Sequence, residues 1–241
     1  MNENTEITAY PATSQNQKKI LIIGDSMAED AVAAIKLNKP NFFIWKIMYD
    51  DLCLNPDIKI KNCIISRKDF DKKYPLIQKA DLIYFIAGFN YNTRFDKLLE
   101  ILKKDELDRL QIITSAHFTD PVWLMPEIKN KKLTIKDEKN LDRLYGLRLH
   151  YDTYMAAMRI KNWAKKNKVG FTLGYDLQCK KIERPRGPLQ KLYKDIESYS
   201  CPFIRNEKLM IFDTAHKSKQ GPTLFGKQLI DVLNEKLEIS N

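Results

Sequence analysis

Short apolar runs alternate with longer stretches of helical periodicity along the chain. The runs predict strands, and the runs at 19–24 and 80–88 are continuous enough for strands buried on both faces. The other predicted strands are 41–48, 58–65, 111–116, 169–177 and 208–213. Helical spacing of apolar side chains occurs at 30–36, 93–110, 138–166 and 219–238. This alternation favours an α/β fold with about five parallel strands between helices.

The length of the chain predicts one domain. A chain of 241 residues with 44% hydrophobic residues has enough apolar side chains for one large core. We expect residues 1–17 to form a flexible polar segment and residues 18–241 to form the domain. Two surface excursions, near 117–138 and 178–206, contain proline and lysine clusters and are in a position to roof a site.

Cysteine and histidine usage gives no sign of a metal site or a cofactor. Cys53, Cys63, Cys179 and Cys201 form no CxxC pair, and we interpret them as buried or incidental thiols. The chain holds three histidines and no HExxH motif, so we expect catalysis without metal or cofactor. The sequence has no apolar run long enough for a transmembrane segment and no visible signal peptide. These features predict a cytoplasmic protein, or an exported one whose start has been trimmed.

The net charge of +10 is compatible with nucleic acid, an anionic membrane surface or an acidic substrate. The lysines are spread through helix-like contexts, and no RNA-binding or zinc-finger pattern accompanies them. We therefore expect no nucleic-acid partner, and the sequence leaves the oligomeric state open.

The first predicted strand ends in Gly24-Asp25-Ser26, immediately before a helix. Polar groups at the carboxyl ends of parallel strands meet in a crevice, where helix N-termini favour anions. Ser26 there is either an N-cap or a nucleophile that also supplies a backbone donor. A serine nucleophile needs a base, and His216, three residues after Asp213, provides a histidine with a carboxylate to orient it. Asp213 is alternatively the cap of the last helix.

Two further strand ends carry polar groups. Gly88 and Asn90 follow the strand at 80–88, and Asn90 is either an oxyanion donor or a turn residue. His117 follows the strand at 111–116, where it either lines a pocket or lies in a surface loop.

The segments "IIGDSMAED", "IAGFN" and "FDTAHKSKQG" resemble the first, third and last sequence blocks of the SGNH (GDSL-type) hydrolases. The resemblance implies a flavodoxin-like, three-layer αβα fold. It also implies that Ser26 is the nucleophile, His216 the base and Asp213 its partner, with Asn90 and the Ser26 amide as oxyanion donors.

Two blocks depart from the family pattern. Ser66 and Arg67 stand where the second block usually has a glycine that donates to the oxyanion, so either backbone N–H is a candidate donor. The Arg67 side chain is also a candidate for binding an anionic group. In the third block, the aspartate that usually follows Asn90 is missing.

The predicted function is therefore a serine esterase that removes a short acyl group, acetyl by the resemblance to the family, from a carbohydrate or related ester. Ser26, Asp213 and His216 are the catalytic residues, and Gly88, Arg67 and His117 are candidates for substrate binding. The alternatives are a carbohydrate O-acetyltransferase with the same triad and an inactive binding module for an anionic glycan.

Overall fold

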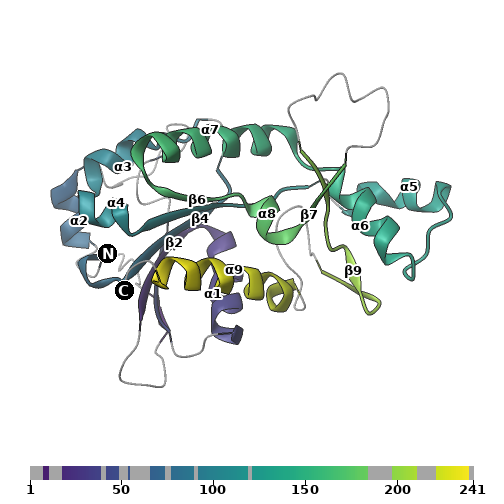
Figure 1. Ribbon diagram of the computed structural model, residues 1–241, viewed down its shortest axis with the longest axis horizontal. Coiled ribbons are helices and arrows are strands. Elements are labelled where there is room, and N and C mark those ends of the chain that lie inside the picture. Colours follow the sequence, from purple (N-terminus) through teal and green to yellow (C-terminus); the bar gives the residue numbers. More distant parts are fainter. Residues whose placement is uncertain are drawn as a thin grey trace, which may run out of the picture.

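A six-stranded sheet forms the centre of the molecule (Figure 1). The computed structural model describes residues 8–10, 18–38, 42–48, 54, 66–73, 77–89, 92–118, 121–183, 197–210 and 221–238. The strand order is β1 (Thr8–Tyr10), β3 (Phe43–Met48), β2 (Lys19–Gly24), β4 (Leu82–Ala87), β5 (Leu110–Thr114) and β6 (Gly170–Thr172). The strands from β3 to β6 are parallel, which confirms the predicted five-stranded parallel sheet.

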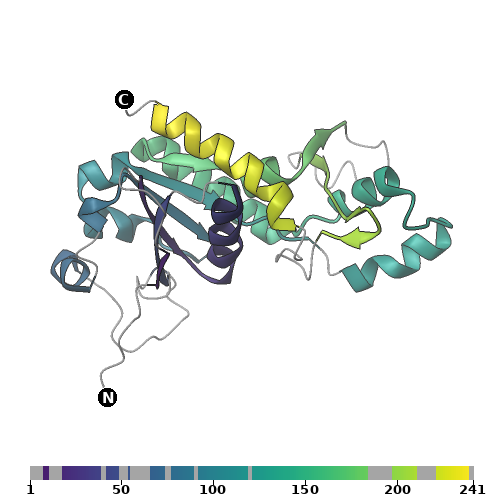
Figure 2. The ribbon, with the colours of Figure 1, turned by 90° about the horizontal axis from the view of Figure 1, so that it is seen from below.

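Side chains of the central strands alternate between two apolar cores. Leu21 and Ile23 of β2 point into one core, and Ile20 and Ile22 point into the other. The first core packs against α2 (Arg67–Lys73), α3 (Asp96–Ile101), α4 (Lys104–Asp108) and α7 (Tyr151–Asn167). The second packs against α1 (Ser26–Asn38) and α9 (Gly221–Glu238), which lie side by side (Figure 2). The three-layer αβα arrangement is confirmed.

The two excursions build a small lobe, which we define as the described residues of 116–150, 173–183 and 197–210. It contains η3 (Pro121–Leu124), α5 (Met125–Asn130), α6 (Glu138–Gly146) and α8 (Gly174–Gln178). Two antiparallel pairs complete it: β7 (Lys180–Ile182) with β8 (Ser198–Ser200), and β9 (Ile204–Arg205) with β10 (Lys208–Leu209). Its buried side chains, many of them aromatic, form a third core. The described residues of the two excursions are therefore packed structure beside the sheet (Figure 1).

Several predicted elements differ from the observed ones. The helix expected at 93–110 is divided into α3 and α4, because the backbone N–H of Lys103 donates to the Glu106 carboxylate and starts a new helix. The helix expected at 138–166 is divided into α6 and α7. Between them, Leu149 pairs with Phe118, and the backbone N–H of His150 donates to the His117 carbonyl.

Other predicted segments are shorter or lie elsewhere. The strand expected at 169–177 is β6 followed by α8, and the strand expected from 208 is β10, which belongs to the small lobe. Within the segment 1–17, Thr8–Tyr10 forms β1 and pairs antiparallel with β3. The strand predicted at 58–65 lies outside the described residues.

Two of the cysteines form a disulfide, Cys179–Cys201, so the prediction of incidental thiols was wrong for this pair. The two residues flank the antiparallel pair of β7 and β8, which brings their Cα atoms to 4.3 Å. The pairing of these strands is therefore what makes the bond possible. Cys53 and Cys63 lie outside the described residues. Among the helices that the structure describes, none combines the length and apolar character needed to cross a bilayer.

Candidate active site

Ser26 is the first residue of α1 and is exposed at the carboxyl end of β2. The residue that caps the helix is Asp25, whose Oδ1 accepts a 2.8 Å hydrogen bond from the backbone N–H of Met27. Gly24 permits the backbone of β4 to approach closely, because a β-carbon placed there would lie 2.1 Å from the carbonyl oxygen of Ile86. This arrangement places Ser26 at the positive end of a 13-residue helix, with another residue doing the capping.

Asp25 also joins β2 to the neighbouring strand β4. Its Oδ2 accepts a 2.8 Å hydrogen bond from the backbone N–H of Gly88, the first residue after β4. The carboxylate therefore fixes the turn after β2 against the turn after β4. The stretch that contains Asn90 begins from the second of these turns.

His117, after β5, completes a cluster of three strand ends. A β-carbon placed on Gly88 would lie 3.3 Å from Nε2 of His117 and 3.4 Å from Oδ2 of Asp25. The Nε2 atom is buried, so this ring lies against the strand ends and is not a surface-loop side chain. The carboxyl ends of β2, β4 and β5 thus bring Asp25, Gly88 and His117 together beside Ser26.

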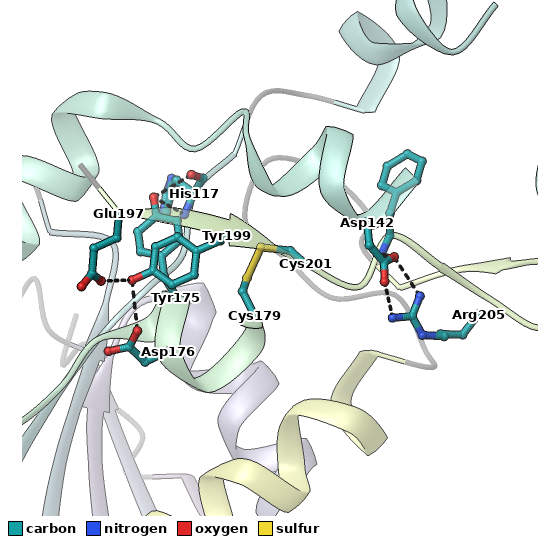
Figure 3. Close-up of a disulfide and its surroundings, with 10 residues drawn as sticks. His117, Asp142, Tyr175, Asp176, Cys179, Glu197, Tyr199, Cys201 and Arg205 are labelled. Atoms are coloured by element: carbon teal, nitrogen blue, oxygen red, sulfur yellow. Dashed lines mark hydrogen bonds and ion pairs between the residues drawn. A yellow bond between two sulfur atoms is a disulfide. The ribbon is translucent and has the colours of Figure 1, made fainter. Parts of the chain in front are cut away.

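The backbone of His117 is held by the small lobe. The hydroxyl of Tyr175 donates to the His117 carbonyl oxygen at 2.7 Å and accepts from the His117 N–H at 3.2 Å (Figure 3). Tyr175 is fully buried, and burial raises the pKa of its hydroxyl above the ordinary value. The hydroxyl therefore stays protonated and anchors this part of the site.

The structure places Arg67 in an ion-pair cluster at the opposite ends of the strands. Its guanidinium contacts both carboxylate oxygens of Asp71 and of Glu106, and it donates to the carbonyl of Ile101. Glu106 belongs to α4, just before the amino end of β5. A strand of five or six residues spans roughly 17–20 Å, which separates this corner from the carboxyl ends. The Arg67 guanidinium is therefore remote from Ser26, and Ser66 directly precedes α2, the helix that begins with Arg67.

Three of the predicted site residues, Asn90, Asp213 and His216, lie outside the described residues. Their roles stay predictions. Within the described ranges, no group of histidine, cysteine and acidic side chains has the arrangement of a metal site.

The small lobe holds a second polar cluster, next to the disulfide (Figure 3). The Tyr199 hydroxyl lies within hydrogen-bond distance of carboxylate oxygens of Glu197 (2.6 Å) and Asp176 (3.0 Å), which share its one proton, and Lys181 pairs with both acids. Burial favours the neutral form of Glu197, but the hydrogen bonds from Lys181 and Tyr199 outweigh it and lower the pKa of Glu197. This cluster ties α8 to β7 and β8.

Sequence reasoning missed Asp25 and Tyr175 as positioning residues. Asp25 was visible in the Gly24-Asp25-Ser26 motif, and its distance of one residue from Ser26 was a usable signal. Tyr175 gave no comparable signal, because its contact with His117 spans 58 positions and depends on the packing of the small lobe.

Solved structures resemble this fold, although no family model and no curated protein matches the sequence. The periplasmic domain of a lipopolysaccharide acetyltransferase from Salmonella ser. Paratyphi A aligns over 92% of this chain and 85% of its own, with 13% identity and a TM-score of 0.59. A putative acylhydrolase from Bacteroides fragilis aligns over 95% and 92%, with 14% identity and a TM-score of 0.43. The C-terminal catalytic domain of peptidoglycan O-acetyltransferase A from Streptococcus pneumoniae aligns over 92% and 96%, with 11% identity and a TM-score of 0.39.

The parallel sheet, its flanking helices and the likeness to the Salmonella domain define an SGNH hydrolase-type fold. The predicted α/β fold is confirmed.

Proposed function

We propose that this protein transfers a short acyl group through a covalent acyl-Ser26 intermediate. The hydroxyl oxygen of Ser26 attacks the carbonyl carbon of an ester, and His216 accepts the hydroxyl proton. Asp213 orients His216, while Asn90 and the backbone N–H of Ser26 stabilise the oxyanion. The oxyanion collapses, the C–O bond to the leaving alcohol breaks, and His216 returns the proton to that alcohol. A second hydroxyl compound then attacks the acyl-enzyme by the same steps.

The placement of Ser26 is the observation that carries this proposal. An exposed serine at the first position of α1 meets the positive end of the helix, and Asp25 already performs the capping. The turn is also braced by Gly88 across to the next strand. Because Asp25 makes both of these bonds, the exposed Ser26 hydroxyl is not required as the cap, which supports a reactive role for it.

The acceptor decides which enzyme this is. With water as acceptor it is an esterase acting on a carbohydrate or related ester, which is our first proposal. With a sugar hydroxyl it is a carbohydrate O-acetyltransferase. The fold likeness to a lipopolysaccharide acetyltransferase domain over 92% of the chain supports keeping this second candidate.

The disulfide bears on where this chemistry occurs. Disulfides persist mainly in oxidising compartments and are rare in the cytosol, so Cys179–Cys201 supports an exported protein over a cytoplasmic one. Alkylation of protein from cells lysed in acid tests this. We expect both cysteines to resist alkylation until a reductant is added. Alkylation without a reductant would instead support a cytoplasmic protein.

The test of the function is turnover of an aryl acetate by the purified protein and by its Ser26→Ala and His216→Ala variants. We expect turnover, and an acetyl adduct in the intact mass, only in the parent protein. Addition of sugar acceptors then distinguishes the esterase from the O-acetyltransferase. A transferase forms an acetylated sugar and releases correspondingly less free acetate. Absence of both turnover and adduct between pH 6 and 9, roughly where histidine becomes neutral, would support the alternative of an inactive binding module.

A further inference from the structure

The turn between α5 and α6 carries a concentration of lysines. Figures 1 and 2 place this turn at one end of the long axis, opposite α2 and α3. We call the segment 121–139 the basic tip. Its five lysines (Lys129, Lys131, Lys132, Lys136 and Lys139) are all exposed. None of their ammonium groups forms an ion pair or hydrogen bond with another residue in the described ranges.

The acidic groups around the basic tip are engaged elsewhere. Glu127 pairs with Arg148, and Asp137 accepts hydrogen bonds from the backbone N–H and the hydroxyl of Thr134. Glu138 accepts from the backbone N–H of Asn206. No ion pair joins a tip lysine to one of these carboxylates in the described ranges, and the five lysines outnumber the three acidic residues of the segment, so the basic tip carries a net positive charge.

The same segment exposes large apolar side chains. Val122 is 72% exposed, Met125 58% and Ile135 49%. Val122 and Met125 are three positions apart and Lys129 follows four positions later, a spacing that places the three on one side of η3 and α5. Six of the eight exposed large apolar side chains in the described residues lie in the small lobe or at its junction with α7 (Val122, Met125, Ile135, Leu147, Tyr151 and Leu209). Val122, Met125 and Ile135 thus place exposed apolar side chains in the same short segment as the five lysines.

We propose that the basic tip docks the protein on an anionic lipid surface. Lysines attract the negative headgroup layer, and exposed apolar side chains between them enter the boundary between headgroups and acyl chains. An anionic polysaccharide would use the lysines but would gain little from Val122, Met125 and Ile135. The combination of both residue types therefore favours a bilayer, and this inference does not depend on the acyl-transfer proposal.

The geometry of the tip keeps the lysines presented. The backbone N–H of Leu133 donates to the carbonyl of Ile128, and that of Lys132 donates to Lys129, which closes the end of α5. Lys132 adopts a φ of 52°, the left-handed conformation that such helix ends require. The chain then enters the Thr134–Asp137 turn before α6. The three lysines 131, 132 and 136 thus lie within one tight connection.

Cosedimentation with vesicles tests the proposal. The probes are vesicles of phosphatidylcholine alone and of phosphatidylcholine with phosphatidylglycerol, at low and high salt. We expect binding only to the anionic vesicles, weakened by salt. The variant Lys131→Gln/Lys132→Gln/Lys136→Gln should bind on the order of 100-fold more weakly, since each lysine near an anionic surface contributes roughly a five-fold factor.

Matched control variants remove the same number of positive charges, or of exposed apolar side chains, from parts of the molecule outside the basic tip. Lys165→Gln/Lys166→Gln/Lys168→Gln also removes three exposed lysines, one of which, Lys168, has a positive φ of 58° like Lys132. Leu37→Ser/Leu99→Ser controls for Val122→Ser/Met125→Ser, and thermal unfolding checks that each variant is folded. We expect only the tip variants to lose binding.

Three outcomes would overturn the proposal. They are failure of the parent protein to bind anionic vesicles, equal loss in the lysine control, and full binding by folded Val122→Ser/Met125→Ser. In the last case, salt-sensitive binding of a sulfated dextran through the same lysines would identify an anionic glycan as the partner. Acetyl-ester turnover is measured in parallel and has no bearing on any of these outcomes.

Discussion

The backbone N–H of Gly88 donates to the carboxylate of Asp25 across 63 positions of sequence, and this one contact joins the turns after two neighbouring strands. The other oxygen of the same carboxylate caps α1. Asp25 therefore sets both the helix that carries Ser26 and the distance from that helix to the end of β4.

Replacement of Asp25 separates these two tasks. Asp25→Ser retains a cap but cannot reach Gly88, whereas Asp25→Ala loses both bonds. Loss of a cap costs about 1 kcal/mol, and loss of a hydrogen bond to a charged group about 1.5–3 kcal/mol. We expect Asp25→Ala to be the less stable variant in urea unfolding, and both variants to lose aryl acetate turnover. Full turnover in Asp25→Ser would show that the bond to Gly88 does not position Ser26.

His117 is expected to limit the size of the acyl group, because its ring lies against Gly88 at the strand ends. In His117→Ala the space left by the ring should admit longer chains, so the ratio of kcat/KM for an aryl butyrate to that for the acetate should rise. Tyr175→Phe should shift this ratio less, since it loosens the His117 backbone without removing the ring. An unchanged ratio in His117→Ala would place the ring outside the acyl pocket.

The Arg67 and Glu106 pair is expected to stabilise the corner formed by α2 and α4. Glu106 is fully buried, so Arg67→Met leaves a buried carboxylate without its cation. Breaking such a pair costs about 3–5 kcal/mol, whereas replacing both partners costs much less. Chemical unfolding should therefore show a large loss for Arg67→Met and partial recovery in Arg67→Met/Glu106→Gln. Additive losses in the double variant would contradict this account.

Stability at acid pH is expected to depend on Glu197. Because its pKa is lowered in the folded state, its ionised form stabilises the protein above the ordinary glutamate pKa of about 4.3. That contribution is lost as the pH falls through the lower, folded-state pKa. The difference in Tm between the parent and Glu197→Gln should thus be present at pH 6 and shrink below pH 4. A difference in Tm that stays constant with pH would show that Glu197 stabilises the protein through packing and not through its charge.

Prediction from sequence succeeded for elements whose structure is determined by the residues of one short segment. The continuous apolar run at 19–24 became β2 with the same limits, since a strand buried on both faces needs no polar positions. The small lobe was not predicted, because its core joins Phe118, Tyr145 and Tyr199, which come from three separated segments. The disulfide depended in the same way on the pairing of β7 with β8.

The candidate site shows the same division. The motif around Ser26 identified the turn, and the placement of that turn at the carboxyl end of β2 follows from the order of the sheet. The resemblance to the family's second block made Arg67 a candidate for the site, but its side chain contacts two carboxylates at the other end of the strands. The Asp71 contact is a local pair four positions along α2, but the Glu106 contact depends on α4 becoming the neighbour of α2, which no local pattern encodes.

The bond between Cys179 and Cys201 closes the 22 positions that separate them into a covalent ring. A protease that makes one cut inside this ring leaves both fragments attached, because the disulfide still joins the ends of β7 and β8. A single cut there therefore does not separate Tyr199 of β8 from Tyr175, the residue whose hydroxyl holds the His117 backbone.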